Sequence, residues 1–156
     1  MSQVEKIVNY LIEHKLTVAT AESCTGGLIA AGFTDLAGVS AVFGYGLVTY
    51  SNEAKERLLG VSHDTLLAHG AVSRETAEEM ALGLAKLSQA DFSVSVTGIA
   101  GPGGGSDEKP VGLVYFGLAH HGSVTTERCV FHGDREEIRR QSRDHAYDMI
   151  AALMGI

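Results

Sequence analysis

Residues 20–27 read Thr-Ala-Glu-Ser-Cys-Thr-Gly-Gly, with polar residues and glycines where a strand is expected to turn into a helix. A short β-prone run, Leu16–Ala21, leads into this stretch, and an apolar segment with helical character, Leu28–Leu36, follows it. Glycines at such a junction let a bound group approach the backbone. The free N–H groups and positive end of the following helix favour an anion or a developing oxyanion. Ser23 and Thr25 add hydroxyls, so the turn is either an active site or a place where a hydroxyl only caps the helix.

Strands and helices alternate along most of the chain. The expected helices are Ser2–Lys15, Leu28–Leu36, Glu53–Leu59, Asp64–Ala68, Ser73–Gln89 and Asp134–Met154. The expected strands are Leu16–Ala21, Ala41–Tyr50, Asp91–Thr97, Val111–Ala119 and Ser123–Phe131. Only three residues separate the last two strands, which predicts an antiparallel hairpin. This order predicts a three-layer α/β/α sandwich with a mixed sheet, folded as a single domain over residues 1–156.

Composition excludes several classes of protein. The net charge of −7 argues against a nucleic-acid binder, whose binding surface is basic. No apolar run approaches the roughly 20 residues that span a bilayer, and Met1–Lys15 lacks the apolar core of a signal peptide, so we expect a soluble, cytoplasmic protein that binds no membrane. The two cysteines, Cys24 and Cys129, indicate neither a disulfide framework nor a zinc site. Cys24 adjoins Ser23 and is a rival nucleophile.

A glycine-rich segment, Thr97–Pro110, follows an apolar strand and is too rich in glycine for regular structure. It is either a flexible linker or a ligand-binding loop. The second interpretation is attractive because open α/β sheets bind ligands beyond the carboxyl ends of their strands.

Four arginines lie within nine positions of the final helix: Arg135, Arg139, Arg140 and Arg143. Three of them recur every four residues and therefore lie on one face, where like charges repel by roughly 0.2–0.5 kcal/mol per pair. A phosphate would relieve this repulsion, because it matches the guanidinium fork. A solvated or salt-bridged face, with Glu136 reaching Arg140, is the alternative.

Hydrolysis by a serine needs a base that takes the hydroxyl proton. The seven histidines belong to no recognisable triad or metal-binding motif. Lysine is the other option, provided that burial or a neighbouring cation lowers its pKa from about 10.4. Lys55 is the one lysine in a strand-to-helix junction comparable to the Ser23 turn.

Three segments occur in the order found in a known family: Ala21–Gly27, Tyr50–Val61 and Thr97–Gly104. Together they resemble the CinA C-terminal domain family, whose characterised activity is nicotinamide mononucleotide (NMN) amidohydrolase, also called NMN deamidase. The resemblance covers nearly the whole chain. It implies a five-stranded, mostly parallel sheet with one antiparallel strand, and a homo-oligomer, usually a dimer. Because no molybdopterin-binding-like domain precedes the match, we expect the stand-alone form without the pyrophosphatase activity of that domain.

The resemblance implies a Ser/Lys hydrolase of pyridine nucleotide salvage that converts NMN and water to nicotinic acid mononucleotide and ammonia, with no metal or organic cofactor. Ser23 would be the nucleophile, Lys55 the base, and Tyr50 a residue that orients or relays protons. The backbone N–H groups expected to hold the oxyanion are those around Cys24, Thr25, Gly26 and Gly27.

The glycine-rich loop would wall the nucleotide site through Thr97, Gly98, Gly101, Gly103 and Gly104. Arg139 or Arg140 would bind the phosphate. Two alternatives stay open: an inactive nucleotide-binding or regulatory module of the same fold, and an interaction protein related to competence or DNA damage.

Overall fold

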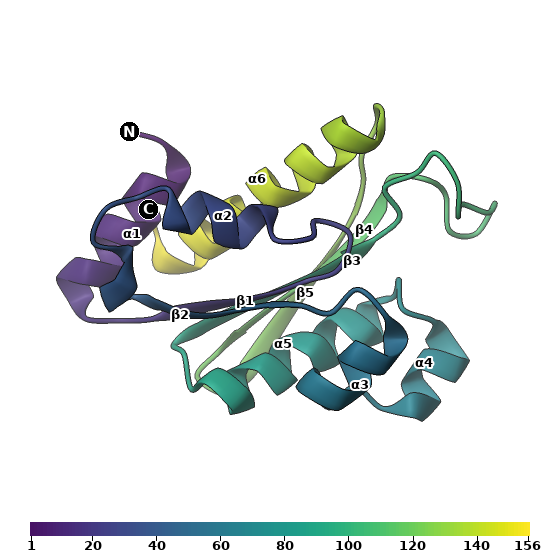
Figure 1. Cartoon of the computed structure of the whole chain (residues 1–156), viewed down its shortest axis with the longest axis horizontal. Helices are drawn as coiled ribbons and strands as arrows, with labels where there is room; N and C mark the ends of the chain where they lie inside the picture. The colour runs from purple at the N-terminus through teal and green to yellow at the C-terminus, as the bar shows by residue number, and fades with distance from the viewer.

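The computed structural model describes residues 1–156 and contains one five-stranded sheet with helices on both faces (Figure 1). The strands are β1 (Val18–Glu22), β2 (Phe43–Val48), β3 (Phe92–Gly98), β4 (Leu113–His120) and β5 (Ser123–Val130). Their order across the sheet is β2-β1-β3-β4-β5. β1 pairs in parallel with β2 and β3, whereas β4 is antiparallel to β3 and β5. The sheet is therefore mixed with one reversed strand, as predicted.

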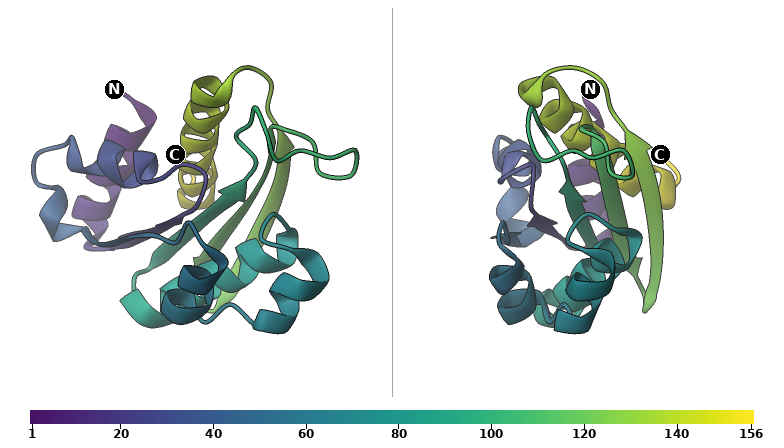
Figure 2. Two further views of the ribbon diagram at one scale, coloured as in Figure 1. Left: turned by 45° about the vertical axis from the view of Figure 1, so that its right-hand side comes forward. Right: turned by 90° about the vertical axis from the view of Figure 1, so that its right-hand side faces the viewer.

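Six α-helices and a 3-10 turn complete the fold: α1 (Gln3–His14), α2 (Leu28–Thr34), η1 (Val39–Ala41), α3 (Asn52–Leu59), α4 (His63–His69), α5 (Arg74–Ser88) and α6 (Arg135–Met154). α1, α2 and α6 cover one face of the sheet, and α3, α4 and α5 cover the other (Figures 1 and 2). This arrangement confirms the three-layer sandwich. None of the helices has the length and apolarity that crossing a membrane requires.

Alternation along the strands assigns their side chains to two different layers. In β3, Phe92, Val94 and Val96 pack in the larger core under α1, α2 and α6. On the opposite face Ser95 donates from its hydroxyl to the carbonyl oxygen of Ala77 in α5, over 2.6 Å. Small polar residues therefore allow α5 to lie close to the sheet.

Two of the predicted helix N-caps are present. Ser51 accepts from the backbone N–H of Ala54 at the start of α3, and Asp134 forms a capping box with Glu137 at the start of α6. The strand predicted at Ala41–Tyr50 is shorter than expected. It begins at Phe43 after the 3-10 turn and ends at Val48, which leaves the next two carbonyls free to bind elsewhere.

A close approach between α5 and the end of α3 depends on one glycine. A Cβ atom at Gly83 would lie 1.7 Å from the carbonyl oxygen of Leu59, so no other residue fits there without movement. Because α3 carries Lys55, this contact helps to place the lysine relative to the sheet.

Candidate active site

Ser23 and Lys55 come from two separate strand-to-helix junctions and meet in the folded chain. Ser23 directly follows β1, and Lys55 lies one turn into α3. Lys55 Nζ is 3.0 Å from Ser23 Oγ, within hydrogen-bond distance. Lys55 is fully buried and Ser23 is 8% exposed. The contact brings together the two residues that the resemblance implied as base and nucleophile.

Burial shifts the Lys55 amine toward its neutral form. Nζ donates to the carbonyl oxygens of Thr49 (2.7 Å) and Tyr50 (3.2 Å), and no carboxylate forms an ion pair with it. Burial lowers the pKa of Lys55 from 10.5 to about 8. A neutral amine has two N–H groups and one lone pair. Because the two carbonyls can only accept, they take the N–H groups and leave the lone pair for the Ser23 hydroxyl.

The N-terminus of α2 is capped by the buried carboxylate of Glu22 and not by the hydroxyl of Ser23 or Thr25. Glu22 is 1% exposed and accepts from the Thr25 hydroxyl (2.6 Å) and from the backbone N–H groups of Ile29 (3.0 Å) and Ala30 (3.1 Å). The alternative interpretation, in which the hydroxyl of Ser23 or Thr25 only caps the helix, is therefore wrong. So is the expectation that the helix end lies open to a ligand anion, because Glu22 already neutralises it.

Three backbone N–H groups of the turn remain free. The N–H groups of Cys24, Thr25 and Gly27 donate to no acceptor in the chain. Gly26 differs, because its N–H donates to the carbonyl oxygen of Ser23 over 3.0 Å. Of the four residues predicted to hold an oxyanion, three can therefore donate and Gly26 cannot.

Cys24 is poorly suited to act as the nucleophile. Its side chain is 5% exposed and packs in the larger core. Burial raises the pKa of the Cys24 thiol to about 12, so the reactive thiolate is scarce near neutral pH.

Tyr50 contacts Lys55 through its backbone and not through its side chain. Its hydroxyl accepts from Arg135 Nη2 at 3.2 Å, and its side chain is largely exposed. The structure thus directs the phenol of Tyr50 toward α6, while its carbonyl oxygen helps to hold the lysine amine.

The glycine-rich loop is anchored at several points. The buried Thr97 hydroxyl donates to the carbonyl oxygen of Ala71 (2.8 Å), and Gly98 lies against Val114 where a Cβ would clash. The Gly101 carbonyl oxygen accepts from Arg135 Nη1 (2.7 Å). Gly103 and Gly104 are exposed, and the connection between β3 and β4 forms an arm that projects from the sheet (Figures 1 and 2). The arm is tied back where Lys109 Nζ donates to the carbonyl oxygen of His69. These contacts argue against a free linker.

The arginines of α6 line a hollow of about 490 Å³ beside the turn, a size suited to a small ligand. Its walls are Leu28, Arg135, Glu136, Arg139, Arg140 and Arg143. Arg139 donates from Nε to the carbonyl oxygen of Cys24 (3.1 Å) and from Nη2 to that of Thr25 (3.0 Å). Arg143 pairs with Asp144 at 2.9 Å. Arg140 is exposed and has no hydrogen bond or ion pair, so the pairing expected with Glu136 is absent.

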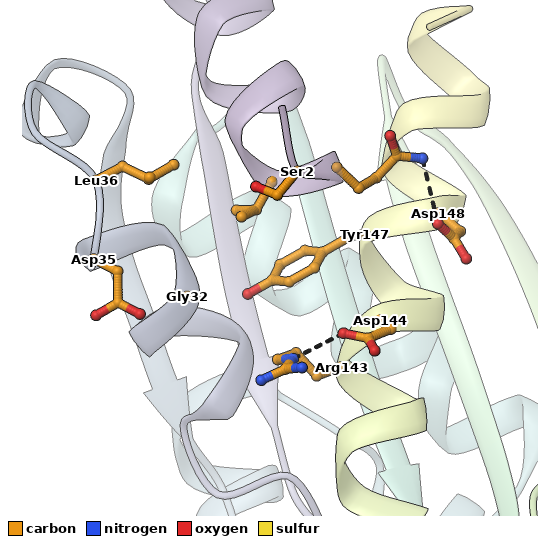
Figure 3. A pocket seen from close by; sticks show the side chains of 10 residues that line it. Ser2, Gly32, Asp35, Leu36, Arg143, Asp144, Tyr147 and Asp148 are labelled. Atoms are coloured by element: carbon orange, nitrogen blue, oxygen red, sulfur yellow. Dashed lines mark hydrogen bonds and ion pairs between the residues drawn. The ribbon is translucent and has the colours of Figure 1, made fainter.

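A second hollow, of about 540 Å³, lies between α1, α2 and α6 (Figure 3). Tyr147 forms part of its wall and donates to the carbonyl oxygen of Ile29. Three carboxylates, Asp35, Asp144 and Asp148, accompany the single guanidinium of Arg143. This hollow would repel a phosphate, which fits the arginine-lined hollow far better.

Sequence reasoning missed the roles of Glu22 and of the Thr49 carbonyl. Glu22 stands at the end of an apolar strand, one residue before Ser23 and just ahead of a helix, and a carboxylate in that position is a signal for N-terminal capping. No sequence signal predicts that the Thr49 carbonyl binds Lys55, because every residue has a backbone carbonyl.

The chain is similar in sequence to proteins of a known family. The family model described as CinA C-terminal domain matches residues 1–154. A protein of Clostridium beijerinckii, named for competence-damage induction, is 52% identical over 150 residues, which cover 96% of this chain and 37% of that protein. The chain thus spans little more than a third of the length of this curated relative.

Two solved structures are similar over nearly their full length. Competence damage-inducible protein A of Klebsiella pneumoniae has a TM-score of 0.95 and 36% identity, covering 98% of this chain and 95% of that one. The competence/damage inducible protein CihA of Agrobacterium tumefaciens has a TM-score of 0.92 and 47% identity, covering 99% of this chain and 97% of the other.

Proposed function

This chain belongs to the CinA C-terminal domain family, and on that premise we propose that it is an amidohydrolase that deamidates NMN to nicotinic acid mononucleotide and ammonia. The observation that carries the proposal is the 3.0 Å contact between Ser23 Oγ and a buried Lys55 amine whose N–H groups face two carbonyls. A hydroxyl paired with a neutral amine is an activated nucleophile.

In the first half of the proposed reaction Ser23 Oγ attacks the carboxamide carbon, and its proton moves to Lys55 Nζ. The free N–H groups of Cys24, Thr25 and Gly27 are available to the oxygen that becomes negatively charged. Collapse of the tetrahedral intermediate breaks the C–N bond. Lys55 returns the proton to the departing nitrogen, which leaves as ammonia, and an ester remains on Ser23.

In the second half a water molecule attacks the ester and gives a proton to Lys55. The bond between the acyl carbon and Ser23 Oγ then breaks and the serine recovers its proton from Lys55. Nicotinic acid mononucleotide is formed as the carboxylic acid, which releases its remaining proton to solvent and leaves as a carboxylate. Every proton transfer to or from Ser23 and the departing nitrogen passes through one amine, so the chemistry needs no second base.

The nucleotide phosphate is proposed to bind in the arginine-lined hollow. Arg139 joins this hollow to the turn, since it contacts the carbonyls of Cys24 and Thr25. Arg140, which has no partner within the chain, is the guanidinium most available to a phosphate.

The deciding experiment measures ammonia release from NMN by the purified protein and by Ser23→Ala. We expect turnover by the wild type and a loss of at least about a thousandfold in Ser23→Ala, because the ester can no longer form. Ser123→Ala, a matched change on exposed β5, serves as the control and should behave as wild type. Circular dichroism checks that both variants are folded.

Absence of ammonia release by the wild type, with NMN binding seen by calorimetry, would support the regulatory module instead. Full turnover by Ser23→Ala would rule out the covalent mechanism.

A further inference from the structure

The Ser23–Gly27 turn is held from two sides by a pair of oppositely charged side chains. The Glu22 carboxylate accepts from the Thr25 hydroxyl and from the backbone N–H groups of Ile29 and Ala30 in α2. The Arg139 guanidinium donates to the carbonyl oxygens of Cys24 and Thr25. Neither role follows from the deamidation chemistry itself, which needs only the hydroxyl, the amine and the free amides.

The position of Arg139 bears directly on the Thr25 amide. In a trans peptide the C=O and N–H groups point in opposite directions, and the peptide that joins Cys24 to Thr25 is trans. When Arg139 Nε holds the Cys24 carbonyl, the Thr25 N–H must therefore point away from the guanidinium. That N–H is one of the three that have no partner in the chain.

The guanidinium of Arg139 lies close to the backbone of the turn. A Cβ atom at Gly26 would lie 3.4 Å from Arg139 Nη2, and Gly26 has a φ of 57°. Arg139 is partly buried, whereas the neighbouring Arg140 is exposed and free. The two adjacent arginines are thus placed for different tasks.

We propose that Arg139 is a positioning residue that holds the Cys24 and Thr25 carbonyls and thereby aims the Thr25 N–H at the substrate's developing oxyanion, with Glu22 bracing the opposite side of the turn. The inference rests on the proposed deamidation for its chemical meaning. It separates two tasks that were predicted as one: Arg140 binds the phosphate, and Arg139 shapes the site that stabilises the transition state.

The test uses Arg139→Lys and Arg139→Gln, both of which remove the planar fork whose separate N–H groups donate to the two carbonyls. For each variant kcat and KM are measured with NMN, and ¹⁵N relaxation gives the order parameters of the Cys24, Thr25 and Gly27 amides. Arg128→Lys, on the exposed face of β5 and without side-chain partners, is the matched control. Arg140→Lys provides the contrast within the hollow.

We expect kcat to fall by about 10- to 100-fold in the Arg139 variants, with KM within a few-fold of wild type, because the loss concerns only the transition state. The turn amides should lose order. Arg140→Lys should instead raise KM and leave these amides ordered. Added methylguanidinium should restore part of the lost kcat in a small-side-chain variant, Arg139→Ala.

An unchanged kcat, a rise in KM alone, or undisturbed turn amides in the Arg139 variants would overturn the proposal and return Arg139 to the phosphate. If wild-type protein releases no ammonia, the proposed function fails by itself. The relaxation measurement then still decides whether Arg139 holds the turn, because it requires no turnover.

Discussion

The hydrogen-bond partners of the Lys55 amine are two carbonyl oxygens and the Ser23 hydroxyl. With a pKa of about 8 instead of 10.5, roughly a tenth of the lysine is neutral at pH 7, compared with about 0.03% for an ordinary lysine. Burial thus increases the fraction of usable base about 300-fold at neutral pH. Such a gain would allow Lys55 to act as the proposed base without a histidine.

Activity should therefore follow the ionisation of one amine. We expect kcat/KM for NMN to rise about tenfold per pH unit below pH 8 and to level off above it, because only the neutral amine accepts the Ser23 proton. A pH profile of initial rates from pH 6 to pH 10 measures this. A midpoint between pH 6 and 7 would indicate a histidine and contradict the lysine base.

The lowered pKa of Lys55 should also make the free energy of unfolding depend on pH. Below pH 8 the folded state bears the full cost of a buried charge on Lys55, and between pH 8 and pH 10.5 the unfolded chain holds more protons, so folding becomes more favourable as pH rises. Relative to Lys55→Met, the free energy of unfolding of wild type should increase by up to roughly 2 to 3 kcal/mol from pH 7 to pH 10. Urea titrations at both pH values measure it. A difference that is constant with pH would mean that the lysine titrates normally.

At the scale of elements, the active site depends on how closely α5 and α3 approach each other. Gly83 lies within α5, where alanine would by itself favour the helix by about 1 kcal/mol. The Leu59 carbonyl oxygen occupies the space that the methyl group would need. In an alanine variant the steric clash with Leu59 therefore opposes the gain in helix propensity, and we expect the clash to have the larger effect on stability.

Gly83→Ala is expected to lower the free energy of unfolding by about 1 to 3 kcal/mol, as overpacking does in well-packed cores. Because α3 must move to relieve the clash, turnover should fall as well. Gly44→Ala is the control, since a Cβ at Gly44 meets nothing within 4 Å. Chemical denaturation measures both variants, and a Gly83→Ala protein as stable as wild type would show that α3 moves freely.

At the scale of the whole molecule, an acidic protein carries a local basic surface, where the anionic substrate is proposed to bind. The net charge is −7, yet four arginines line one hollow beside the catalytic turn. The charge distribution is thus more informative than the net charge, because exposed charges are screened within about 10 Å at 0.1 M salt. The nearby carboxylate-rich hollow would help to exclude the phosphate from the wrong side of α6.

Substrate choice provides a direct measure of this arrangement. Nicotinamide riboside, which lacks the phosphate, should show a kcat/KM about 10- to 100-fold lower than NMN, the loss expected for charge-assisted hydrogen bonds. Arg140→Ala should raise KM for NMN and leave the weak reaction of the riboside almost unchanged. Equal loss with both substrates would place the phosphate elsewhere.

Local signals along the chain were sufficient to predict most of the fold. Alternation of apolar residues, cap residues such as Ser51 and Asp134, and the short His120–Gly122 connection correctly indicated the helices, the hairpin and a mixed sheet. These features depend on neighbours within a few residues, so the sequence carries them directly. The same local logic selected the Ser23 turn and singled out Lys55 at a second junction, and the motif resemblance implied their roles.

Tertiary structure alone decided which groups meet. The contact of Lys55 with Ser23 and the hydrogen bonds of Arg139 to two turn carbonyls join parts of the chain that no periodic pattern relates. The phenol of Tyr50 likewise turned toward Arg135 because the packing of α6 put a donor there. Backbone carbonyls and amides are present at every residue. Which of them stays free or finds a partner depends on the packing of distant elements, and that is why sequence could name the reacting side chains but not the geometry around them.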